Sequence, residues 1–290
     1  MRISSRIVFA NLTQQLSALY ARREAQTIAF ELLEHFYQLS KTDILSDKYF
    51  KPAENQELAL QEALVRLQKH EPLQYILQKA YFLGKTFYVT PAVLIPRPET
   101  EELVSWIVQE NLSNKHLTDF HVLDIGTGSG CIALTVKALL PFAQVTSIDI
   151  SPEALQVARY NAQKLGLEVN FLEVDFLTQT ELLTNQFWNV IVSNPPYISP
   201  HERQDIAPNV LAYEPHLALF PPENLHSLIF YEKIAQFAQK QLASQGTLFF
   251  ELNPLYASAI EQLVKDANFS EITIRADMQG KLRMLRAKKT

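Results

Sequence analysis

Residues 121–131 read His-Val-Leu-Asp-Ile-Gly-Thr-Gly-Ser-Gly-Cys, a short apolar stretch that runs directly into a loop holding three of the chain's seven glycines. This pattern predicts a buried strand, a tight loop that a ligand can approach closely, and a helix over residues 131–140. A dinucleotide-binding loop has its third glycine one position later. The G-x-G-x-G spacing therefore favours a nucleoside that carries an amino acid over a pyrophosphate, with an ordinary glycine-rich turn as the alternative.

A second apolar segment, residues 145–149, ends in the carboxylate of Asp149, about 20 residues beyond the glycine-rich loop. An acid at this place typically accepts hydrogen bonds from both ribose hydroxyls of a bound nucleoside. The residues that follow, Ser151-Pro152-Glu153, predict the start of a helix. Asp149 is therefore the candidate ribose ligand, and the alternative is a second capping group for that helix.

The third signal is Asn194-Pro195-Pro196-Tyr197, which directly follows the apolar segment 190–193. Neither proline has a backbone N–H and each fixes φ, so the strand must end there with rigid carbonyls beside the Asn194 side-chain oxygen. A planar amide or nucleobase amine can donate one N–H to Asn194 and one to the Pro195 carbonyl while Tyr197 stacks on its face. The motif indicates a site for a planar amino group, and the alternative is a proline-terminated turn.

The pattern along the chain predicts two parts and a short connection. Residues 1–75 show helical periodicity and are expected to form a small bundle, residues 76–100 a hairpin linker, and residues 101–290 an α/β domain with a mostly parallel sheet. The expected apolar faces of the bundle are Ala25, Ile28, Ala29, Leu32 and Phe36, and Leu60, Ala63, Leu64 and Leu67. The expected strands are 122–124, 145–149, 171–174, 190–193 and 247–251, with 272–275 and 283–286 paired antiparallel at one edge.

Composition narrows the class of protein. The net charge is −5 at pH 7, and residues 1–75 carry nine Lys or Arg against nine Asp or Glu, which disfavours a nucleic-acid substrate. The single cysteine, Cys131, is expected to be a small buried residue, and seven scattered histidines give little support for a metal site. No apolar run approaches the ~20 residues of a membrane span, and the first residues lack a signal-peptide core. We expect a cytoplasmic monomer that does not bind membranes.

Together the motifs resemble a known family. The loop 126–130, Asp149 and the 194–197 motif are similar to class I S-adenosylmethionine-dependent methyltransferases that modify a planar amine or amide nitrogen. The segments 94–101 (LIPRPETE), 213–219 (YEPHLAL) and 277–283 (DMQGKLR) extend the similarity to the PrmC/HemK family of peptide chain release factor glutamine methyltransferases. The resemblance covers about residues 70–285.

The resemblance implies a fold, a cofactor and a substrate. The fold would be α/β, a Rossmann-like class I methyltransferase domain with a mostly parallel seven-stranded sheet and a small N-terminal helical domain for substrate recognition. The cofactor would be S-adenosyl-L-methionine. The reaction would methylate the side-chain amide nitrogen of the glutamine in the Gly-Gly-Gln motif of class I release factors, with these proteins as partners and no direct nucleic-acid substrate.

The resemblance also assigns residues. The cofactor would be held by Gly126, Thr127, Gly128, Ser129, Gly130, Asp149, Asp175, Phe176 and Asn194. The catalytic motif would be Asn194, Pro195, Pro196 and Tyr197, which would bind the substrate together with Arg97; Glu99 and Glu101 would lie nearby unless their segment is a solvated loop. Phe176 stands where the family often has a Trp, Trp188-Asn189 replaces a Phe-Asp pair, and Asn253 replaces a glycine. Phe176 can still stack but lacks an indole N–H, and neither of the other two departures touches the expected chemistry directly.

Other functions stay open at this point. A glutamine methyltransferase acting on a ribosomal protein and a nucleobase amino-methyltransferase would use the same motifs. A nicotinamide-dependent oxidoreductase would share the sheet and the glycine-rich loop, but it leaves the 194–197 motif unexplained. A non-catalytic protein of this fold would bind the cofactor and transfer nothing.

Overall fold

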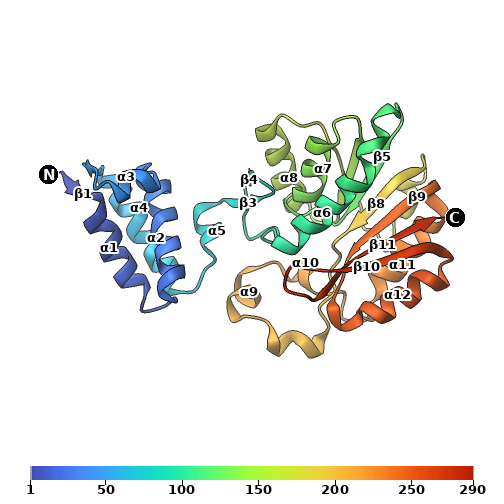
Figure 1. Ribbon diagram of the computed structural model, residues 1–290. Coiled ribbons are helices and arrows are strands. Elements are labelled where there is room, and N and C mark those ends of the chain that lie inside the picture. Colours follow the sequence, from blue (N-terminus) through green and yellow to red (C-terminus); the bar gives the residue numbers. More distant parts are fainter. Residues whose placement is uncertain (1, 290) are drawn as a thin grey trace. The chain divides into compact units, whose positions relative to one another are not determined.

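The computed structural model describes residues 2–289, apart from the side chain at position 200. These residues divide into two compact units, of which the first ends at Gln78 and the second begins at Lys79. The first unit is helical and the second combines helices with a sheet (Figure 1). Within the described residues no helix has both the length and the apolar character that a membrane span requires.

The first unit is a bundle of helices around one core. Its elements are β1 (Ile3–Ser4), α1 (Ser5–Leu16), α2 (Arg22–Tyr37), α3 (Lys41–Leu45), β2 (Tyr49–Phe50), α4 (Glu54–Gln68) and α5 (Leu73–Leu77). Serines start two of the helices: the Ser4 hydroxyl accepts a hydrogen bond from the Ile7 N–H, and Ser40 forms a capping box with Asp43. The expected apolar faces meet in the core, where Phe36 and Leu64 are partly buried and the other seven residues are fully buried.

A hairpin opens the second unit. Strand β3 (Ala80–Phe82) pairs antiparallel with β4 (Lys85–Phe87), and Phe82 and Phe87 are fully buried in the core of the α/β unit. Glu101 accepts a hydrogen bond from the Leu83 backbone N–H at 3.0 Å, so its carboxylate fastens the turn of the hairpin. The hairpin therefore packs as part of the second unit.

Seven strands of the second unit form one sheet. They are β5 (His121–Ile125), β6 (Gln144–Asp149), β7 (Asn170–Glu173), β8 (Trp188–Ser193), β9 (Leu242–Glu251), β10 (Phe269–Ala276) and β11 (Leu282–Lys289). Their order is β10-β11-β9-β8-β5-β6-β7, with β5 to β9 parallel and β11 antiparallel to both of its neighbours. This confirms the expected mostly parallel seven-stranded sheet with its antiparallel edge.

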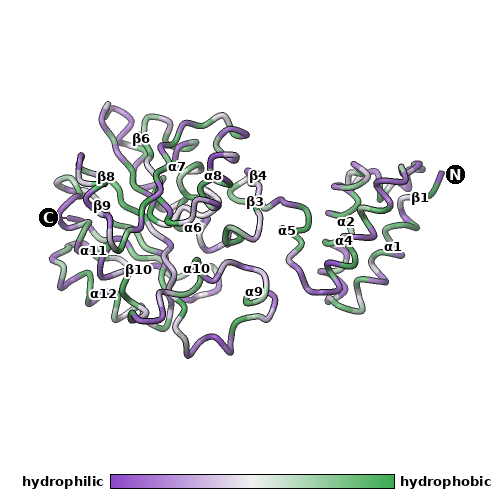
Figure 2. The backbone as a smooth tube through the Cα atoms, turned by 180° about the vertical axis from the view of Figure 1, so that it is seen from behind, coloured by the Kyte–Doolittle hydropathy of each residue, from purple (hydrophilic) through white to green (hydrophobic). Residues whose placement is uncertain are grey.

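Helices cover both faces of this sheet, with α6 (Pro98–Asn111), α7 (Cys131–Leu139) and α8 (Pro152–Leu165) on one face and α11 (Ile229–Gln241) and α12 (Ala257–Asp266) on the other. The short helices α9 (Pro208–Tyr213) and α10 (His216–Leu219) lie in the segment between β8 and α11, and 3₁₀ turns lie at Leu112–His116, Thr180–Leu183, Pro200–Asp205 and Pro254–Tyr256. Successive strand residues point to opposite faces. In β5, Val122 packs in the cluster that contains α6 and α7, whereas Leu123 packs with α11 and α12. Figure 2 shows the hydrophobic colouring of the central strands that separate these two layers.

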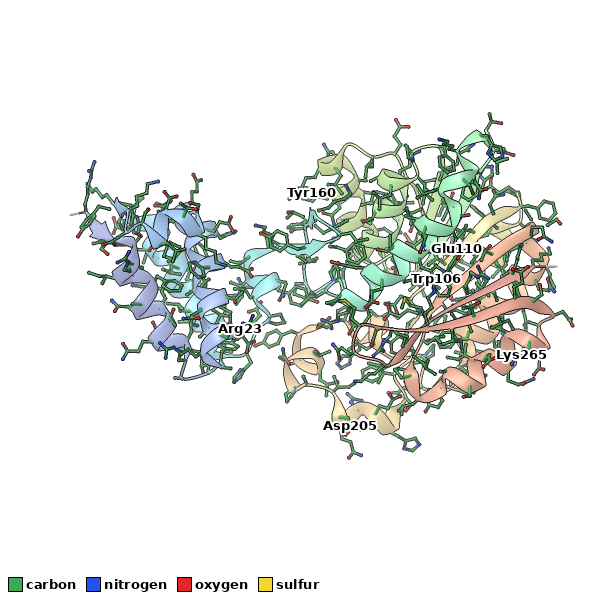
Figure 3. The ribbon with its side chains drawn as sticks, viewed as in Figure 1. Arg23, Trp106, Glu110, Tyr160, Asp205 and Lys265 are labelled. Atoms are coloured by element: carbon green, nitrogen blue, oxygen red, sulfur yellow. The ribbon has the colours of Figure 1, made fainter. Side chains whose placement is uncertain are left out.

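Helix α6 is tied to the antiparallel edge of the sheet. The Arg275 guanidinium lies 4.0 Å from the Trp106 ring centre, and Arg286 pairs with Glu110 at 2.8 Å. The Trp106 indole N–H donates to Glu110 at 3.1 Å, so both residues labelled on α6 in Figure 3 hold the helix against β10 and β11. These contacts fix the helix whose first turn faces the site described next.

Candidate active site

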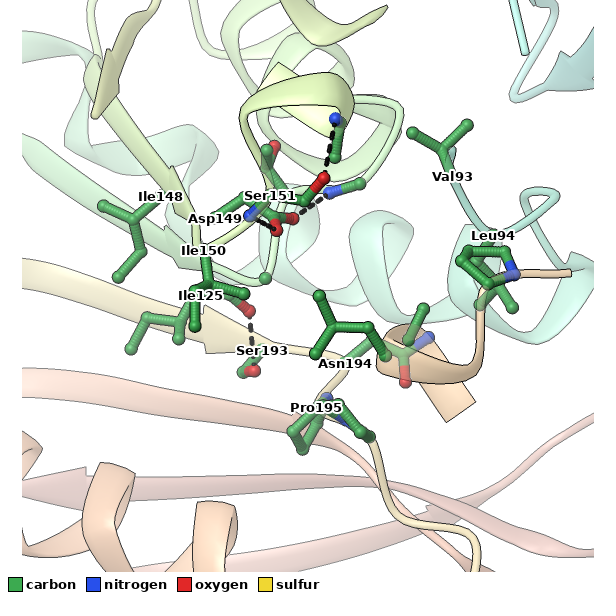
Figure 4. A pocket seen from close by; sticks show the side chains of 18 of the residues that line it. Val93, Leu94, Ile125, Ile148, Asp149, Ile150, Ser151, Ser193, Asn194 and Pro195 are labelled. Atoms are coloured by element: carbon green, nitrogen blue, oxygen red, sulfur yellow. Dashed lines mark hydrogen bonds between the residues drawn. The ribbon is translucent and has the colours of Figure 1, made fainter. Parts of the chain in front are cut away.

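The site lies where the chain order of the sheet reverses. Strand β5 stands between β6 and β8, and in an open parallel sheet such a switch point leaves a crevice at the carboxyl ends of the strands. A cavity of about 250 Å³ occupies this position (Figure 4). Residues lining it come from segments 92–97, 125–132, 148–151, 174–177, 193–196 and 215–222, together with Thr100, Ala154 and Phe230. Widely separated motifs therefore meet in one cavity.

The glycine-rich loop is held by the end of the neighbouring strand. The backbone N–H groups of Gly126 and Thr127 both donate to the Ile148 carbonyl at 2.9 Å. Gly130 has φ +81° and begins α7, and a Cβ there would lie 3.0 Å from the Leu134 side chain and 3.3 Å from Ala158. Gly130 therefore allows both the left-handed turn and the close packing of α7 on α8.

Asp149 joins two loops of the cavity wall. Its carboxylate accepts the Gly128 N–H at 2.9 Å on one oxygen and the Ser151 N–H at 3.0 Å on the other. The side-chain cap of α8 is Ser151, whose hydroxyl accepts from the Ala154 N–H, as Figure 4 shows. Burial raises the pKa of Asp149. Because a carboxylate offers about four acceptor positions, Asp149 can still accept from a ligand.

The strand after Asp149 adds an aromatic wall and a second acid. Phe176 lines the cavity and is held edge-to-face against Phe237, with ring centres 5.4 Å apart. The Asp175 carboxylate accepts the Leu177 N–H at 3.0 Å and the Thr178 hydroxyl at 2.8 Å. Both predicted residues lie at the cavity, and in this structure the acid also organises its own turn.

The 194–197 motif splits between the cavity and the core. Asn194, Pro195 and Pro196 line the cavity, and the Asn194 NH₂ donates to the Thr100 hydroxyl at 3.5 Å. Tyr197 is not among the lining residues: it packs against the core and its hydroxyl donates to Glu251 at 3.3 Å. The structure gives Tyr197 an anchoring contact, and its stacking on a substrate stays a prediction.

Arg97 lines the cavity and is held by a buried acid. Its guanidinium pairs with Glu214 at 2.7 Å, and the second oxygen of Glu214 accepts the Ile95 N–H at 3.3 Å. The Glu214 side chain is 1% exposed. Glu214 therefore fixes the segment that carries Arg97. The sequence analysis did not single out this acid, although it lies within the quoted segment 213–219.

Several buried polar groups lie around the glycine-rich loop, including the Asp124 carboxyl and the hydroxyls of Thr127 and Ser129. One Asp124 oxygen accepts the Ser147 hydroxyl at 2.7 Å. Burial raises the pKa of Asp124 from its ordinary 3.8 to about 6, opposed by that hydrogen bond and by one from the Thr127 hydroxyl. Thr127 and Ser129 also line the cavity, so the loop places polar side chains beside the space for a ligand.

The charges of the cavity fit a cationic nucleoside better than a dinucleotide. The charged side chains that line it are Asp149, Asp175 and Arg97, and the arginine is already paired with Glu214. Two carboxylates would repel a pyrophosphate, whereas they can accept from hydroxyls or an ammonium group. The residues present therefore fit S-adenosylmethionine, with Asp149 and Asp175 as acceptors and Phe176 as an apolar wall.

The sole cysteine, Cys131, lies at the start of α7 and lines the cavity. Cys131 is buried, and burial raises the pKa of its thiol to about 12, so the reactive thiolate is scarce at neutral pH. Among residues 2–289, no group of three His, Cys, Asp or Glu side chains is arranged to hold a metal ion.

Comparisons with known proteins agree with this geometry. Residues 103–217 match the family described as Methyltransferase small domain, and residues 8–77 match the PrmC N-terminal domain. The release factor glutamine methyltransferase of Flavobacterium psychrophilum is 42% identical over 94% of this chain and 95% of its own. The protein with the same description from Bacteroides thetaiotaomicron is 37% identical over 97% of this chain and 98% of its own.

Solved structures share the fold at lower identity. A 16S rRNA methyltransferase from T. thermophilus, solved with AdoMet and guanosine, has a TM-score of 0.53 at 21% identity, covering 73% of this chain and 50% of that one. A methyltransferase from Pyrococcus furiosus has a TM-score of 0.51 at 15% identity, covering 82% of this chain and 99% of that one. These likenesses establish the class I methyltransferase fold.

We predict that Asp124 makes stability depend on pH. Its pKa rises from 3.8 in the unfolded chain to about 6 in the folded protein. The stabilisation that the folded protein gains from the protonated Asp124 carboxyl is therefore complete below pH 3.8 and is lost as the pH rises through about 6. Relative to Asp124→Asn, the wild-type free energy of unfolding should fall by about 2.4 kcal/mol between pH 4 and pH 7. Urea unfolding at several pH values measures this. The exposed Asp205→Asn variant should follow the wild type, and parallel profiles for wild type and Asp124→Asn would contradict the prediction.

Proposed function

The chain belongs to the release factor glutamine methyltransferase family, and we propose that it methylates the glutamine of the Gly-Gly-Gln motif in class I peptide chain release factors. The methyl donor is S-adenosyl-L-methionine, which supplies an activated methyl group. The acceptor is the side-chain amide nitrogen. Since release factors work on ribosomes, we assign the enzyme to the cytoplasm. We also propose that it acts as a monomer.

The observation that carries this proposal is the position of Asn194. Its NH₂ is engaged by Thr100, so its oxygen is the group available in the cavity beside Pro195. A primary amide has two N–H donors, and the Asn194 oxygen and the Pro195 carbonyl supply two acceptors. The same cavity contains Asp149 and the glycine-rich loop, so donor and acceptor can be held within one enclosed space.

The residues act by orientation rather than by strong acid or base chemistry. An amide nitrogen is a weak nucleophile because its lone pair is delocalised. Hydrogen bonds from both N–H groups to Asn194 and Pro195 raise the electron density on the nitrogen and fix its direction. Arg97 and its segment line the same cavity, and exclusion of water there would strengthen these contacts. The proton on nitrogen can leave to solvent after methylation.

Substrate recognition away from the chemistry is assigned to the first unit. A glutamine in a flexible loop offers few contacts, so binding energy from other surfaces is needed to hold its amide in line. The first 75 residues have balanced charge, which suits a protein better than a phosphate backbone. The same motif would also accept a nucleobase amine or a ribosomal-protein glutamine, and the first experiment separates these substrates.

Incubation with labelled S-adenosylmethionine tests the function directly. A class I release factor should become labelled on the glutamine of its Gly-Gly-Gln motif, and replacement of that glutamine by alanine should abolish the label. Mass spectrometry of the labelled peptide identifies the residue. Equal labelling of the alanine variant, or preferred labelling of duplex DNA or of a ribosomal protein, would overturn the proposed substrate.

We expect Asn194→Ala to abolish most transfer while the fold survives, because the prolines still end the strand and only the side-chain acceptor is lost. Asn194→Asp should also lose most activity, since a carboxylate there attracts the positive sulfonium and disturbs the alignment of the two reactants. Turnover should fall by at least about tenfold in both variants, the equivalent of one strong hydrogen bond. Near-normal turnover in either variant would show that Asn194 does not orient the amide.

Asp149→Ala should weaken S-adenosylmethionine binding by about 1.5–3 kcal/mol, the range for hydrogen bonds to a charged group. Calorimetry measures the affinity and thermal unfolding reports stability. Ser40→Ala is the control, because it removes the side-chain cap of α3 in the first unit and should lower stability by about 1 kcal/mol with little change in affinity. If Asp149→Ala lowers stability without weakening binding, as Ser40→Ala should, its carboxylate is structural only.

A further inference from the structure

A line of buried polar groups runs from the cavity into the core. The Asn194 NH₂ donates to the Thr100 hydroxyl at 3.5 Å, and that hydroxyl donates to Glu251 Oε2 at 2.6 Å. The Tyr197 hydroxyl donates to the other oxygen, Oε1, at 3.3 Å. Thr100 is 3% exposed and Glu251 is 2% exposed. The proposed chemistry uses neither side chain directly, so their burial beneath Asn194 requires another explanation.

The direction of these hydrogen bonds is determined by the carboxylate. An ionised carboxylate can only accept, so the one hydroxyl proton of Thr100 points to Glu251. The remaining lone pairs of the Thr100 oxygen face Asn194 and can receive only an N–H. If the Asn194 amide turned over, two oxygen acceptors would face each other in a buried place. Since the two ends of an asparagine amide have nearly the same shape, hydrogen bonding alone distinguishes them.

We propose that Thr100 and Glu251 are positioning residues that hold the Asn194 amide with its oxygen toward the substrate. The inference rests on the proposed function, because the oxygen matters only if the substrate presents an NH₂ group. With the amide reversed, the Asn194 NH₂ would meet the substrate NH₂, and two donors would oppose each other.

Groups of the second unit act on the ionisation of Glu251 in both directions. Burial raises the pKa of Glu251, and the nearby charge of Glu99 acts in the same direction. The hydrogen bond from Thr100, the positive charge of Arg283 and the hydrogen bond from Tyr197 oppose that rise.

Arg283 is itself fixed in place. It donates to the Leu252 carbonyl at 3.3 Å and pairs with Asp277 at 3.5 Å. The segment 277–283 thus influences the site through Arg283, whose positive charge favours the ionised form of Glu251.

The test compares variants of Thr100 in the full-length enzyme with an intact release factor as substrate. Thr100→Val keeps the shape and removes the hydroxyl, and it should lower kcat about tenfold, as expected for loss of one orienting hydrogen bond. Thr100→Ser restores the hydroxyl and should keep kcat within about threefold of the wild type. The affinity for S-adenosylmethionine should be unchanged in both. Thr135→Val is the matched control, because it removes a fully buried hydroxyl of α7 that has no hydrogen-bond partner within residues 2–289, and its kcat should equal the wild-type value.

A second variant tests the carboxylate. A glutamine at position 251 can present either its oxygen or its NH₂ to Thr100, so Glu251→Gln no longer forces one orientation of Asn194 and should lower kcat without loss of cofactor affinity. A wild-type kcat in Thr100→Val or Glu251→Gln, or an equal loss in Thr100→Val, Thr100→Ser and Thr135→Val, would refute the positioning role. Absence of glutamine methylation by the wild-type enzyme would instead refute the proposed function. The two failures are therefore distinguishable.

Discussion

Parallel pairing of β5 with both β6 and β8 constrains where every other part of the site can lie. Ile125 at the end of β5 is level with Ile148 on one side and with Ser193 on the other, and the Ser193 hydroxyl donates to the Ile125 carbonyl at 2.7 Å. The loops that follow the three strands therefore leave from the same edge. A slip of one residue would turn the apolar side chains of a strand to the wrong face, so the two cores enforce this register.

Buried and partly buried carboxylates then connect loops that the sheet has brought close. Asp149 joins the glycine-rich loop to the start of α8, Glu214 holds the segment of Arg97, and Glu251 links the first turn of α6 to Tyr197. A buried charge is unfavourable unless hydrogen bonds satisfy it, and each of these acids accepts at least two polar contacts. The same contacts that stabilise the acids make the walls of the cavity rigid. Such rigidity suits a reaction that depends on alignment.

The two units have separate cores and, in the proposed function, separate tasks. The α/β unit contains the cavity and all the residues assigned to chemistry, while the helical unit contributes a surface with balanced charge. A weak nucleophile such as an amide gains from this arrangement, because contacts made far from the reacting nitrogen can be used to orient it. The hairpin packs with the α/β unit through Phe82 and Phe87, so the boundary between the two units falls just before the hairpin.

The sequence by itself determined the features that are local in the chain. Apolar runs, the glycine spacing and the paired prolines indicated the strands, the loop and the end of β8, and they identified Asp149 and Asn194 as site residues. The family resemblance added Asp175 and Phe176, and the structure brings all four residues to one cavity. Only the tertiary structure decided which side chains meet across long separations. Thr100 lies 94 residues before Asn194 and 151 before Glu251, and Glu214 lies 117 residues after Arg97. Tyr197 likewise bonds to Glu251, 54 residues away, outside the cavity lining. A single sequence contains no periodicity that reports such pairs, because they are fixed by the order and register of the strands that carry them.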